Sequence, residues 1–458
     1  MTFFRSSRTV LLLLALAGAS TVVRSQQPAP STPPPQQQSD VRIEITNESG
    51  QPPKYAVPDF VAASSDADTI AATKIVGEVL WNDLDFEREF YLIPRDTYGS
   101  IPPAKSITDV PFDRWKELGA DGLVIGSVQK TPDGNMRVVV RLFQVRSQQS
   151  VFSREYTGPA SNPRFFAHTI SDEIHQNQRA LRGVARTRLT FSSDRDRERV
   201  TNTVENRQVK EVYISDYDGA NQRRVTVNRT LNITPTWSPD GRSIAYTSYR
   251  RGFPDIFISL IFEGTLQNPT ASKGQNWLPA WSPDGTQIAF TSNRDGNAEL
   301  YVMNRDGSNV RRVTNNPAID TTPTWSPTGQ QIAFTSDRSG GPQVYVMGAD
   351  GLNIRRISTD SNCDRATWSP APFNELAFVC RTGGGNDIKV YDFERTEMRQ
   401  ITNGEGSNES PAYSPNGKHI AFTSTRSGKT QIYTVGRDGR GIRQITKVGN
   451  NYFPDWSR

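Results

Sequence analysis

The chain has 458 residues, enough for two domains and a substantial hydrophobic core. Its 53 lysines and arginines exceed its 48 aspartates and glutamates, and the net charge of +5 would suit a nucleic-acid-binding protein. The arginines, however, recur at separated places along the chain, and the N-terminus has the pattern of an export signal. The separation of the arginines and the export signal therefore disfavour nucleic acid as a partner.

Residues 1–25 have the three parts of a secretory signal peptide. Arg5 and Arg8 supply the positive start, Val10 to Leu16 form an apolar run, and small residues suited to cleavage follow. The run is too short to span a membrane comfortably, and no cysteine comes soon after it to carry a lipid. We therefore expect an exported chain without a lipid anchor.

Residues 26–39 are rich in proline and glutamine, a composition that cannot bury a core. We expect this segment to be an extended tether. Two interpretations stay open for it: a spacer without specificity, or an arm that reaches a partner.

Residues 40–182 predict a separate mixed α/β domain. Between residues 68 and 80, apolar side chains recur at helical spacing. The other expected elements are strands at 41–45, 91–93 and 122–128, a helix at 112–118, a hairpin of 136–145 with 150–156, and a final helix at 164–181. None of these elements requires a ligand, so we expect the domain to present or orient a partner.

Between residues 183 and 458 one short sequence phrase occurs six times, and its first copy is PTWSPDG, which starts at Pro235. Its aromatic positions are separated by 44, 44, 43, 45 and 43 residues, at Trp237, Trp281, Trp325, Trp368, Tyr413 and Trp456. A period in the low forties is typical of one four-stranded propeller blade and not of a helical repeat.

Turn residues divide each period into four expected strands. Pro283 has the fixed φ that the second position of a turn needs, and Gly285 accepts the positive φ that follows. Asp306-Gly307 is the dipeptide type that favours tight hairpins. The repeats therefore predict an all-β six-bladed propeller of WD40-like repeats.

The two ends of the repeat region predict how the ring closes. The first unit begins at its second strand, near 187–191, and Trp456 lies in one extra strand at the C-terminus. That strand is expected to complete the first blade, which removes open sheet edges. Two departures are expected: a charged insertion at 194–210, and replacement of the second hairpin of the second blade by 261–274.

The combination of these features resembles the TolB family. The resemblance rests on WKELGADGLVIGSV at 115–128, TPDG at 131–134, HTISDE at 168–173 and SDYDG at 215–219, together with the α/β module joined to six blades. It implies a non-enzymatic periplasmic adaptor of the Tol-Pal system. Such an adaptor binds the lipoprotein Pal through its propeller, contacts TolA in the inner membrane, and supports outer-membrane integrity and invagination during cell division.

The tether differs from the compact N-terminus of that family, so partner contacts of this end do not carry over from the resemblance. A runner-up function also stays open: a TolB-like paralogue whose propeller binds another exported protein or a small ligand. A neighbouring gene for a Pal-like lipoprotein would favour the adaptor, and an isolated gene or several copies would favour the paralogue.

We expect partner binding at the channel mouth, where the segments before each innermost strand gather. Trp277 is an extra tryptophan four residues before a repeat tryptophan, and large aromatic side chains are favoured interface anchors. The alternative is that Trp277 folds back onto a neighbouring blade. The candidate contact residues are Trp277, Leu278, Thr321, Thr322, Arg365 and Phe453.

The motifs of catalysis, metal binding and cofactor binding are missing from the sequence. There is no G-x-S-x-G elbow, and the three histidines, His168, His175 and His419, have no zinc motif around them. Asp216 and Asp218 resemble part of a calcium loop whose other ligands are absent, so an ordinary turn is expected. We expect no catalytic residue, no metal and no cofactor.

Cys363 and Cys380 flank the turn 369–374, and counting outward from that turn places them opposite each other. An oxidising compartment permits a disulfide, although directly opposed strand positions do not always allow its geometry. Both the bridge and two free thiols stay open.

Many arginines fall on the expected fourth strand of each blade, the outer edge of the sheet. They are Arg223, Arg224, Arg311, Arg312, Arg355, Arg356, Arg399 and Arg443. Charges at such edges discourage edge-to-edge association. This distribution predicts a solvated rim, with peripheral attraction to an anionic envelope surface and no nucleic-acid groove.

Overall fold

The computed structural model describes residues 44–46, 51–198, 209–270 and 274–458. The expected signal peptide, the tether, most of the expected strand at 41–45 and most of the charged insertion at 194–210 lie outside these residues. Within the described ranges no helix is long and apolar enough to cross a membrane.

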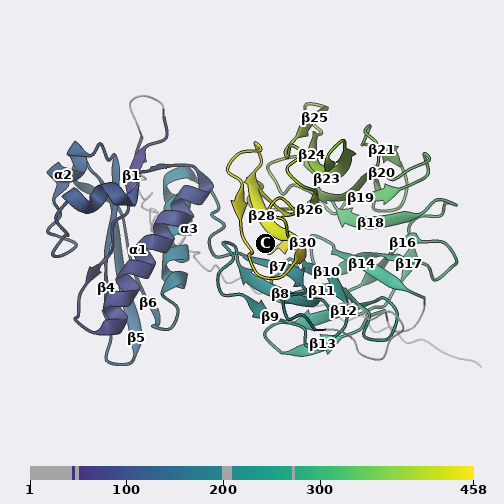
Figure 1. Cartoon of the computed structure of the whole chain (residues 1–458), viewed down its shortest axis with the longest axis horizontal. Helices are drawn as coiled ribbons and strands as arrows, with labels where there is room; N and C mark the ends of the chain where they lie inside the picture. The colour runs from purple at the N-terminus through teal and green to yellow at the C-terminus, as the bar shows by residue number, and fades with distance from the viewer. Residues whose placement is uncertain (1–43, 47–50, 199–208, 271–273) are drawn as a thin grey trace, which may run out of the picture. The chain divides into compact units, whose positions relative to one another are not determined.

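The N-terminal part is an α/β domain built on one mixed sheet (Figure 1). Its strands lie in the order β3-β1-β4-β5-β6, and β2 also pairs with β4. The elements are β1 (Lys54–Ala56), β2 (Val61–Ala62), α1 (Ala67–Glu87), β3 (Tyr91–Leu92), the 3-10 helix η1 (Arg95–Ser100), α2 (Phe112–Glu117), β4 (Gly122–Lys130), β5 (Asn135–Gln144), β6 (Gln149–Pro159) and α3 (Pro163–Arg179).

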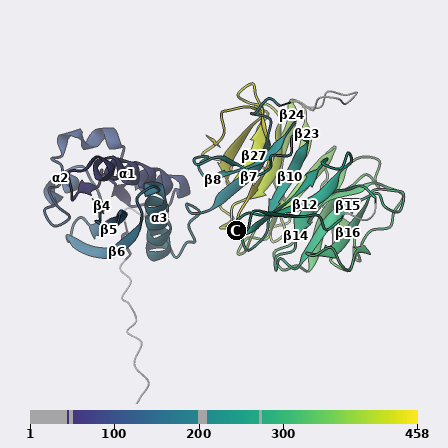
Figure 2. The ribbon, with the colours of Figure 1, turned by 90° about the horizontal axis from the view of Figure 1, so that it is seen from below.

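Alternate residues of the central strand β4 face two different cores. Val124 and Val128 pack with α1 and α3, whereas Leu123 packs with Trp115 of α2. Figure 2 shows α1, α3 and the strands β4, β5 and β6 packed together. The expected helix at 68–80 is real but continues to Glu87, and its start is capped because Asp66 accepts a hydrogen bond from the backbone N–H of Thr69.

The described residues between 188 and 456 form six four-stranded antiparallel sheets arranged as propeller blades, which confirms the predicted fold. From the innermost strand outward, blade 1 contains β30 (Asn451–Trp456), β7 (Arg188–Ser193), β8 (Glu211–Asp216) and β9 (Arg223–Arg224), and blade 2 contains β10 (Asn232–Trp237), β11 (Ser243–Ser248), β12 (Asp255–Leu260) and β13 (Thr265–Gln267). Blade 3 contains β14 (Asn276–Trp281), β15 (Gln287–Ser292), β16 (Glu299–Asn304) and β17 (Arg311–Arg312), and blade 4 contains β18 (Asp320–Trp325), β19 (Gln331–Ser336), β20 (Gln343–Gly348) and β21 (Arg355–Arg356). Blade 5 contains β22 (Cys363–Trp368), β23 (Glu375–Thr382), β24 (Gly385–Asp392) and β25 (Glu397–Gln400), and blade 6 contains β26 (Asn408–Tyr413), β27 (His419–Ser424), β28 (Gln431–Gly436) and β29 (Arg443–Gln444).

The C-terminal strand closes the ring, as the sequence predicts. β30 pairs antiparallel with β7, with Asn451 opposite Ser193 and Trp456 opposite Leu189. The aromatic residues of the repeated phrase are all buried. One of them also joins two blades by a hydrogen bond, because Trp281 Nε1 donates to the carbonyl oxygen of Thr236 at 3.3 Å.

The second blade keeps its outer hairpin, which corrects the expectation that 261–274 replaces it. β12 pairs with β13, with Ser259 opposite Leu266, and the chain turns through Ile261 to Gly264. The sequence misleads here because the turn lacks the Asp-Gly dipeptide and because β13 carries no arginine.

Candidate binding site in the propeller channel

Each innermost strand of the propeller contains the same backbone irregularity. The register with the second strand shifts in the middle of all six, and one residue there has a positive φ of 50–57° without being glycine. These residues are Thr234, Leu278, Thr322, Arg365, Ser410 and Phe453. Residues other than glycine rarely adopt this conformation, and it tends to recur at functional sites. The bulge places these six residues around one cavity of about 150 Å³ in the channel.

Hydroxyl groups of the preceding blade hold this ring of six bulge residues, which we call the channel ring. The backbone N–H of Leu278 donates to Thr247 Oγ1 at 3.0 Å, and that of Phe453 donates to Thr423 Oγ1 at 3.2 Å. At a third position Thr335 Oγ1 donates to Asp364 Oδ1 at 2.7 Å, and the same oxygen accepts from the backbone N–H of Arg365 at 2.6 Å. Bonds between blades therefore hold at least three of the six ring positions.

The channel ring carries one cation and one large aromatic side chain next to each other. The Arg365 guanidinium carbon lies 4.8 Å from the centroid of the Phe453 ring, a cation–π distance. Arg365 Nε also lies 3.7 Å from Asp364 Oδ2. Arginine and aromatic residues that are partly exposed in a concave site are typical anchors of protein interfaces.

Asp455 lines the same cavity from β30. Its Oδ2 accepts a hydrogen bond from the backbone N–H of Trp237 at 2.7 Å. Burial raises the pKa of Asp455 to about 6, because removal of water disfavours the charged carboxylate more than the hydrogen bond to Trp237 and the charge of Arg458 favour it.

The structure brings four of the six candidate contact residues onto the channel ring: Leu278, Thr322, Arg365 and Phe453. Trp277 and Thr321 precede two of them, pair with Thr291 and Thr335 of the second strands, and do not line the cavity. The segments expected to be loops before the innermost strands lie largely inside those strands, since the strands begin earlier than the repeated phrase.

The candidate list omits Thr234 and Ser410 of the channel ring, and also Asp455. A signal was available, because the bulge residue always stands immediately before the first residue of the repeated phrase, which is proline in five of the six copies and Ala366 in the other. An alignment of the six copies on that position would have found the whole ring.

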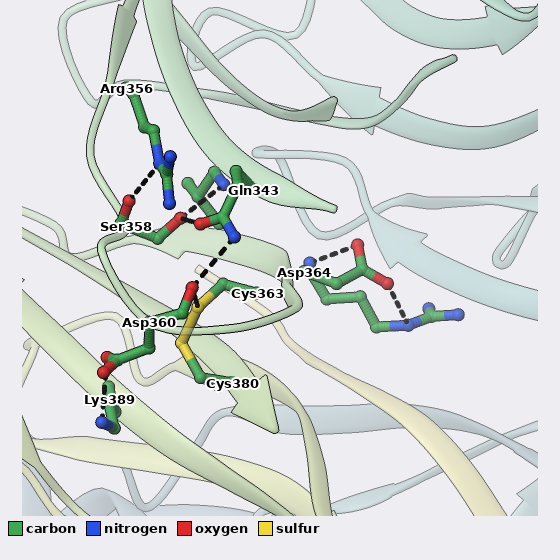
Figure 3. The surroundings of a disulfide bond; sticks show 10 residues. Gln343, Arg356, Ser358, Asp360, Cys363, Asp364, Cys380 and Lys389 are labelled. Atoms are coloured by element: carbon green, nitrogen blue, oxygen red, sulfur yellow. Dashed lines mark hydrogen bonds and ion pairs between the residues drawn. A yellow bond between two sulfur atoms is a disulfide. The ribbon is translucent and has the colours of Figure 1, made fainter. Parts of the chain in front are cut away.

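Cys363 and Cys380 lie directly opposite each other on β22 and β23 and form a disulfide (Figure 3). In two other blades the same pair of positions holds a hydrogen bond, from Ser248 Oγ to Asn232 Oδ1 and from Ser424 Oγ to Asn408 Oδ1. The disulfide thus replaces a polar contact between the first and second strands. The described residues offer one group with metal-ligand spacing, Asp360 with these two cysteines, and both sulfur atoms are engaged in the bridge.

All three histidines are buried. His168 Nδ1 lies 2.7 Å from Asp83 Oδ2, and the Tyr217 hydroxyl donates to Asp83 Oδ1 at 2.7 Å. Although burial opposes the charge of His168, the carboxylates of Asp83 and Asp216 raise its pKa to about 10.

A second buried group joins the end of α1 to blade 6. His419 Nε2 lies 3.1 Å from Glu87 Oε2, and Asn416 Nδ2 donates to Glu87 Oε1 at 3.0 Å. These histidines serve contacts between elements and have no reactive partner in an open cleft of the described chain. Asp216 and Asp218 belong to a turn in which Asp218 Oδ1 accepts from the Ala220 backbone N–H at 3.0 Å.

Comparison with known proteins decides the family. The model of the TolB β-propeller domain matches residues 179–373 and 362–458, and the model of the TolB amino-terminal domain matches residues 41–151. The chain belongs to the TolB family. It is similar to the Tol-Pal system protein TolB of Jannaschia sp. (strain CCS1), at 32% identity over 43% of this chain and 42% of the relative.

A second relative, the Tol-Pal system protein TolB of Desulfosudis oleivorans, is 31% identical over 40% of each chain. The matched region thus spans about two fifths of the length of each of these curated relatives. Among solved structures, TolB from Acinetobacter baumannii matches with a TM-score of 0.75 and 27% identity, covering 89% of this chain and 97% of that one. The TolB family assignment therefore extends over the α/β domain and the propeller together.

Proposed function

We propose that the protein is a non-enzymatic adaptor of the Tol-Pal system that works in the periplasm. It binds a Pal-like peptidoglycan-associated lipoprotein through the propeller and contacts a TolA-like inner-membrane protein. In this role it supports outer-membrane integrity and the inward movement of the outer membrane during cell division. The observation that carries the proposal is family membership over both domains, with relatives that are named as Tol-Pal system proteins.

The channel ring supports the part of the proposal that concerns the lipoprotein. The ring is concave, rigid and partly apolar, and Arg365 and Phe453 offer one charged and one aromatic contact side by side. A pre-formed surface of this kind loses little conformational entropy when a partner binds. An adaptor needs such a surface and no reactive group.

The role in the envelope can be tested in the organism that carries the gene. Deletion is expected to release a periplasmic marker protein into the medium and to delay separation of daughter cells, and the wild-type gene on a plasmid should restore both. A strain that keeps its periplasmic marker and divides normally after deletion would contradict the role. The paralogue function, with another exported protein or a small ligand in the channel, would then replace it.

A further inference from the structure

The seam between blades 1 and 2 holds an open groove of about 320 Å³. One wall consists of β9 and the residues that follow it, Val225 to Asn228, and the other is the outer hairpin of blade 2, Leu260 to Leu266. Tyr246 contributes to the floor. No described residue lines both this groove and the channel ring, so the two are separate sites.

At four other seams, a tight turn of one blade closes against the backbone of the preceding blade. The turn glycines are Gly219, Gly307, Gly351 and Gly439, and a Cβ on any of them would lie 2.3–3.2 Å from a carbonyl oxygen across the seam. Between blades 4 and 5 the ring of Phe393 takes this place, 5.2 Å from the Arg355 guanidinium. In blade 2 the turn glycine is Gly264, which has nothing within 4 Å.

Blade 2 also differs from most other blades at a position of the third strand whose side chain fills the seam. In blades 3 to 6 the third-strand residue that pairs with the first apolar residue of the second strand has a side chain larger and less polar than serine, namely Met303, Met347, Tyr391 and Val435. Blade 2 has Ser259 there, and blade 1 has Ser215 at a seam that its turn glycine closes. The Ser259 hydroxyl lies 3.2 Å from that of Tyr246, which stands where the five other blades have phenylalanine. The floor of the groove is therefore polar, while Val225 and Ile261 beside it are apolar.

Two guanidinium groups at this groove have no acidic partner among the described residues. In four blades the arginine after the second strand stacks on that strand's phenylalanine, as Arg294 does on Phe290 at 5.2 Å. The equivalent Arg250 makes no such contact and lines the groove instead. Arg223 likewise lacks the contact of its counterpart Arg311, which donates to the Ala349 carbonyl of the next blade at 2.9 Å.

The other charged residues that the structure describes near the groove do not neutralise these two arginines. Arg224 is already paired, at 2.8 Å, with Glu211 and, at 3.3 Å, with Glu198. Burial and the nearby positive charge of Arg188 lower the pKa of Arg223. The groove thus presents two positive charges that no described acidic residue pairs with, beside a polar floor and an apolar wall.

The edge strand next to the groove is unprotected. β13 is the outermost strand of blade 2, and its three residues, Thr265 to Gln267, are exposed and uncharged. The outermost strands of blades 1, 3 and 4 each consist of two consecutive arginines instead. An uncharged edge offers backbone N–H and C=O groups to an additional strand.

We infer that this groove binds an extended acidic segment of a partner protein, one in which carboxylate side chains alternate with apolar ones. The carboxylates meet Arg223 and Arg250, an apolar side chain packs against Val225, and the segment's backbone continues the sheet beyond β13. This site is independent of the proposed function at the channel ring, because it shares no residue with it.

A labelled hexapeptide of alternating aspartate and valine tests the inference by fluorescence anisotropy on the purified full chain. Saturable binding is expected, and the same peptide with asparagine in place of aspartate should not bind. Arg223→Gln with Arg250→Gln should weaken binding about tenfold or more, because both charge-assisted contacts are lost. Arg311→Gln, the matched change in blade 3, should leave binding unchanged.

Ser259→Met restores the side chain that blades 3 and 4 carry and should fill the groove, which blocks binding without lowering the melting temperature. Hydrogen exchange should slow at Thr265 to Gln267 when the aspartate peptide is bound. The inference is overturned if the aspartate peptide fails to bind, if the asparagine peptide binds equally, if the arginine variants bind as the wild type does, or if protection appears at the channel ring instead of β13.

Discussion

One pair of positions in the repeats links the first two strands of a blade, and the kind of link differs between blades. The pair of positions that joins the first strand to the second holds asparagine and serine in blades 2 and 6, and a disulfide in blade 5. The register places Cys363 directly opposite Cys380, which explains how the same location accepts either kind of contact.

The disulfide should stabilise the fifth blade measurably. Cys363 and Cys380 are 17 residues apart in sequence, and closing a loop of this size contributes about 3 kcal/mol in the chain-entropy account. The double change Cys363→Ser with Cys380→Ser should lower the melting temperature, and the reducing agent dithiothreitol should have the same effect on the wild type alone. Non-reducing mass mapping of exported protein that found two free thiols would contradict the bridge.

Asp455 should give the propeller a specific dependence on pH. Its pKa is raised from 3.8 to about 6 in the folded chain, so the folded state holds a proton that the unfolded state has released between these values. The stability from this proton is complete below pH 3.8 and is lost as the pH rises through 6. Asp455→Asn keeps an acceptor for the Trp237 N–H and removes the titration.

At pH 8 the Asp455→Asn variant should therefore be more stable than the wild type by roughly 3 kcal/mol, and the difference should nearly vanish at pH 4. Urea unfolding at a series of pH values measures this directly. Stability curves that run parallel from pH 4 to pH 8 would show that the carboxylate of Asp455 does not titrate in this range.

Among the helices and strands, α1 reaches further than its apolar periodicity predicts, and its last two turns carry buried charges beside the buried apolar side chains of Leu84 and Phe86. Asp83 and Glu87 are buried there, against His168, Tyr217 and His419. A search for apolar periodicity stops at Asp83 and Glu87, because it treats buried charged residues as exposed ones. The partners that make these charges tolerable come from segments far along the chain, which the sequence alone does not place together.

The Asp83–His168 pair gives a testable pH window of its own. The pKa of His168 is raised from 6.5 to about 10, so the stability from its protonation is complete below pH 6.5 and is lost as the pH rises through 10. Asp83→Asn removes the carboxylate and should destabilise the chain by roughly 3–5 kcal/mol at pH 7, since the buried charge of His168 loses its nearer partner and keeps only Asp216, 3.9 Å away.

Proton NMR of the histidine rings can follow this directly, because the chain has three histidines. In the wild type His168 should stay protonated through neutral pH, and in Asp83→Asn it should titrate at a lower pH. A His168 ring that titrates near its ordinary pKa of 6.5 in the wild type would contradict the pairing.

Across the whole propeller, the repeated phrase made the six blades and their closure by the C-terminal strand predictable. The period, the aromatic positions and the turn residues recur, and each recurrence constrains the same four-stranded unit. The channel ring was only partly predictable. Its members differ in chemistry, from threonine to arginine and phenylalanine, and what they share is a backbone bulge and positive φ.

The contacts of the outer rim were also only partly predictable from the sequence. The arginines of the outer strands were expected to form a solvated rim, and several of them make contacts with neighbouring blades or acids, such as Arg312 with Glu299 at 2.7 Å. The open seam between blades 1 and 2 arises from several small replacements, Ser259 among them, whose joint effect depends on how two blades pack.

Docking of the Pal-like lipoprotein of the same organism on the channel ring can be measured by isothermal titration calorimetry. The full exported chain and the purified lipoprotein should show saturable binding. Arg365→Ala should weaken that binding about tenfold or more, because a central arginine packed on an aromatic ring is a typical interface anchor. Arg311→Ala on the outer rim should not change it, and Trp277→Ala reports whether the contact extends beyond the ring. Absence of binding, or equal affinity in Arg365→Ala and the wild type, would contradict the assignment of the channel ring as the docking site.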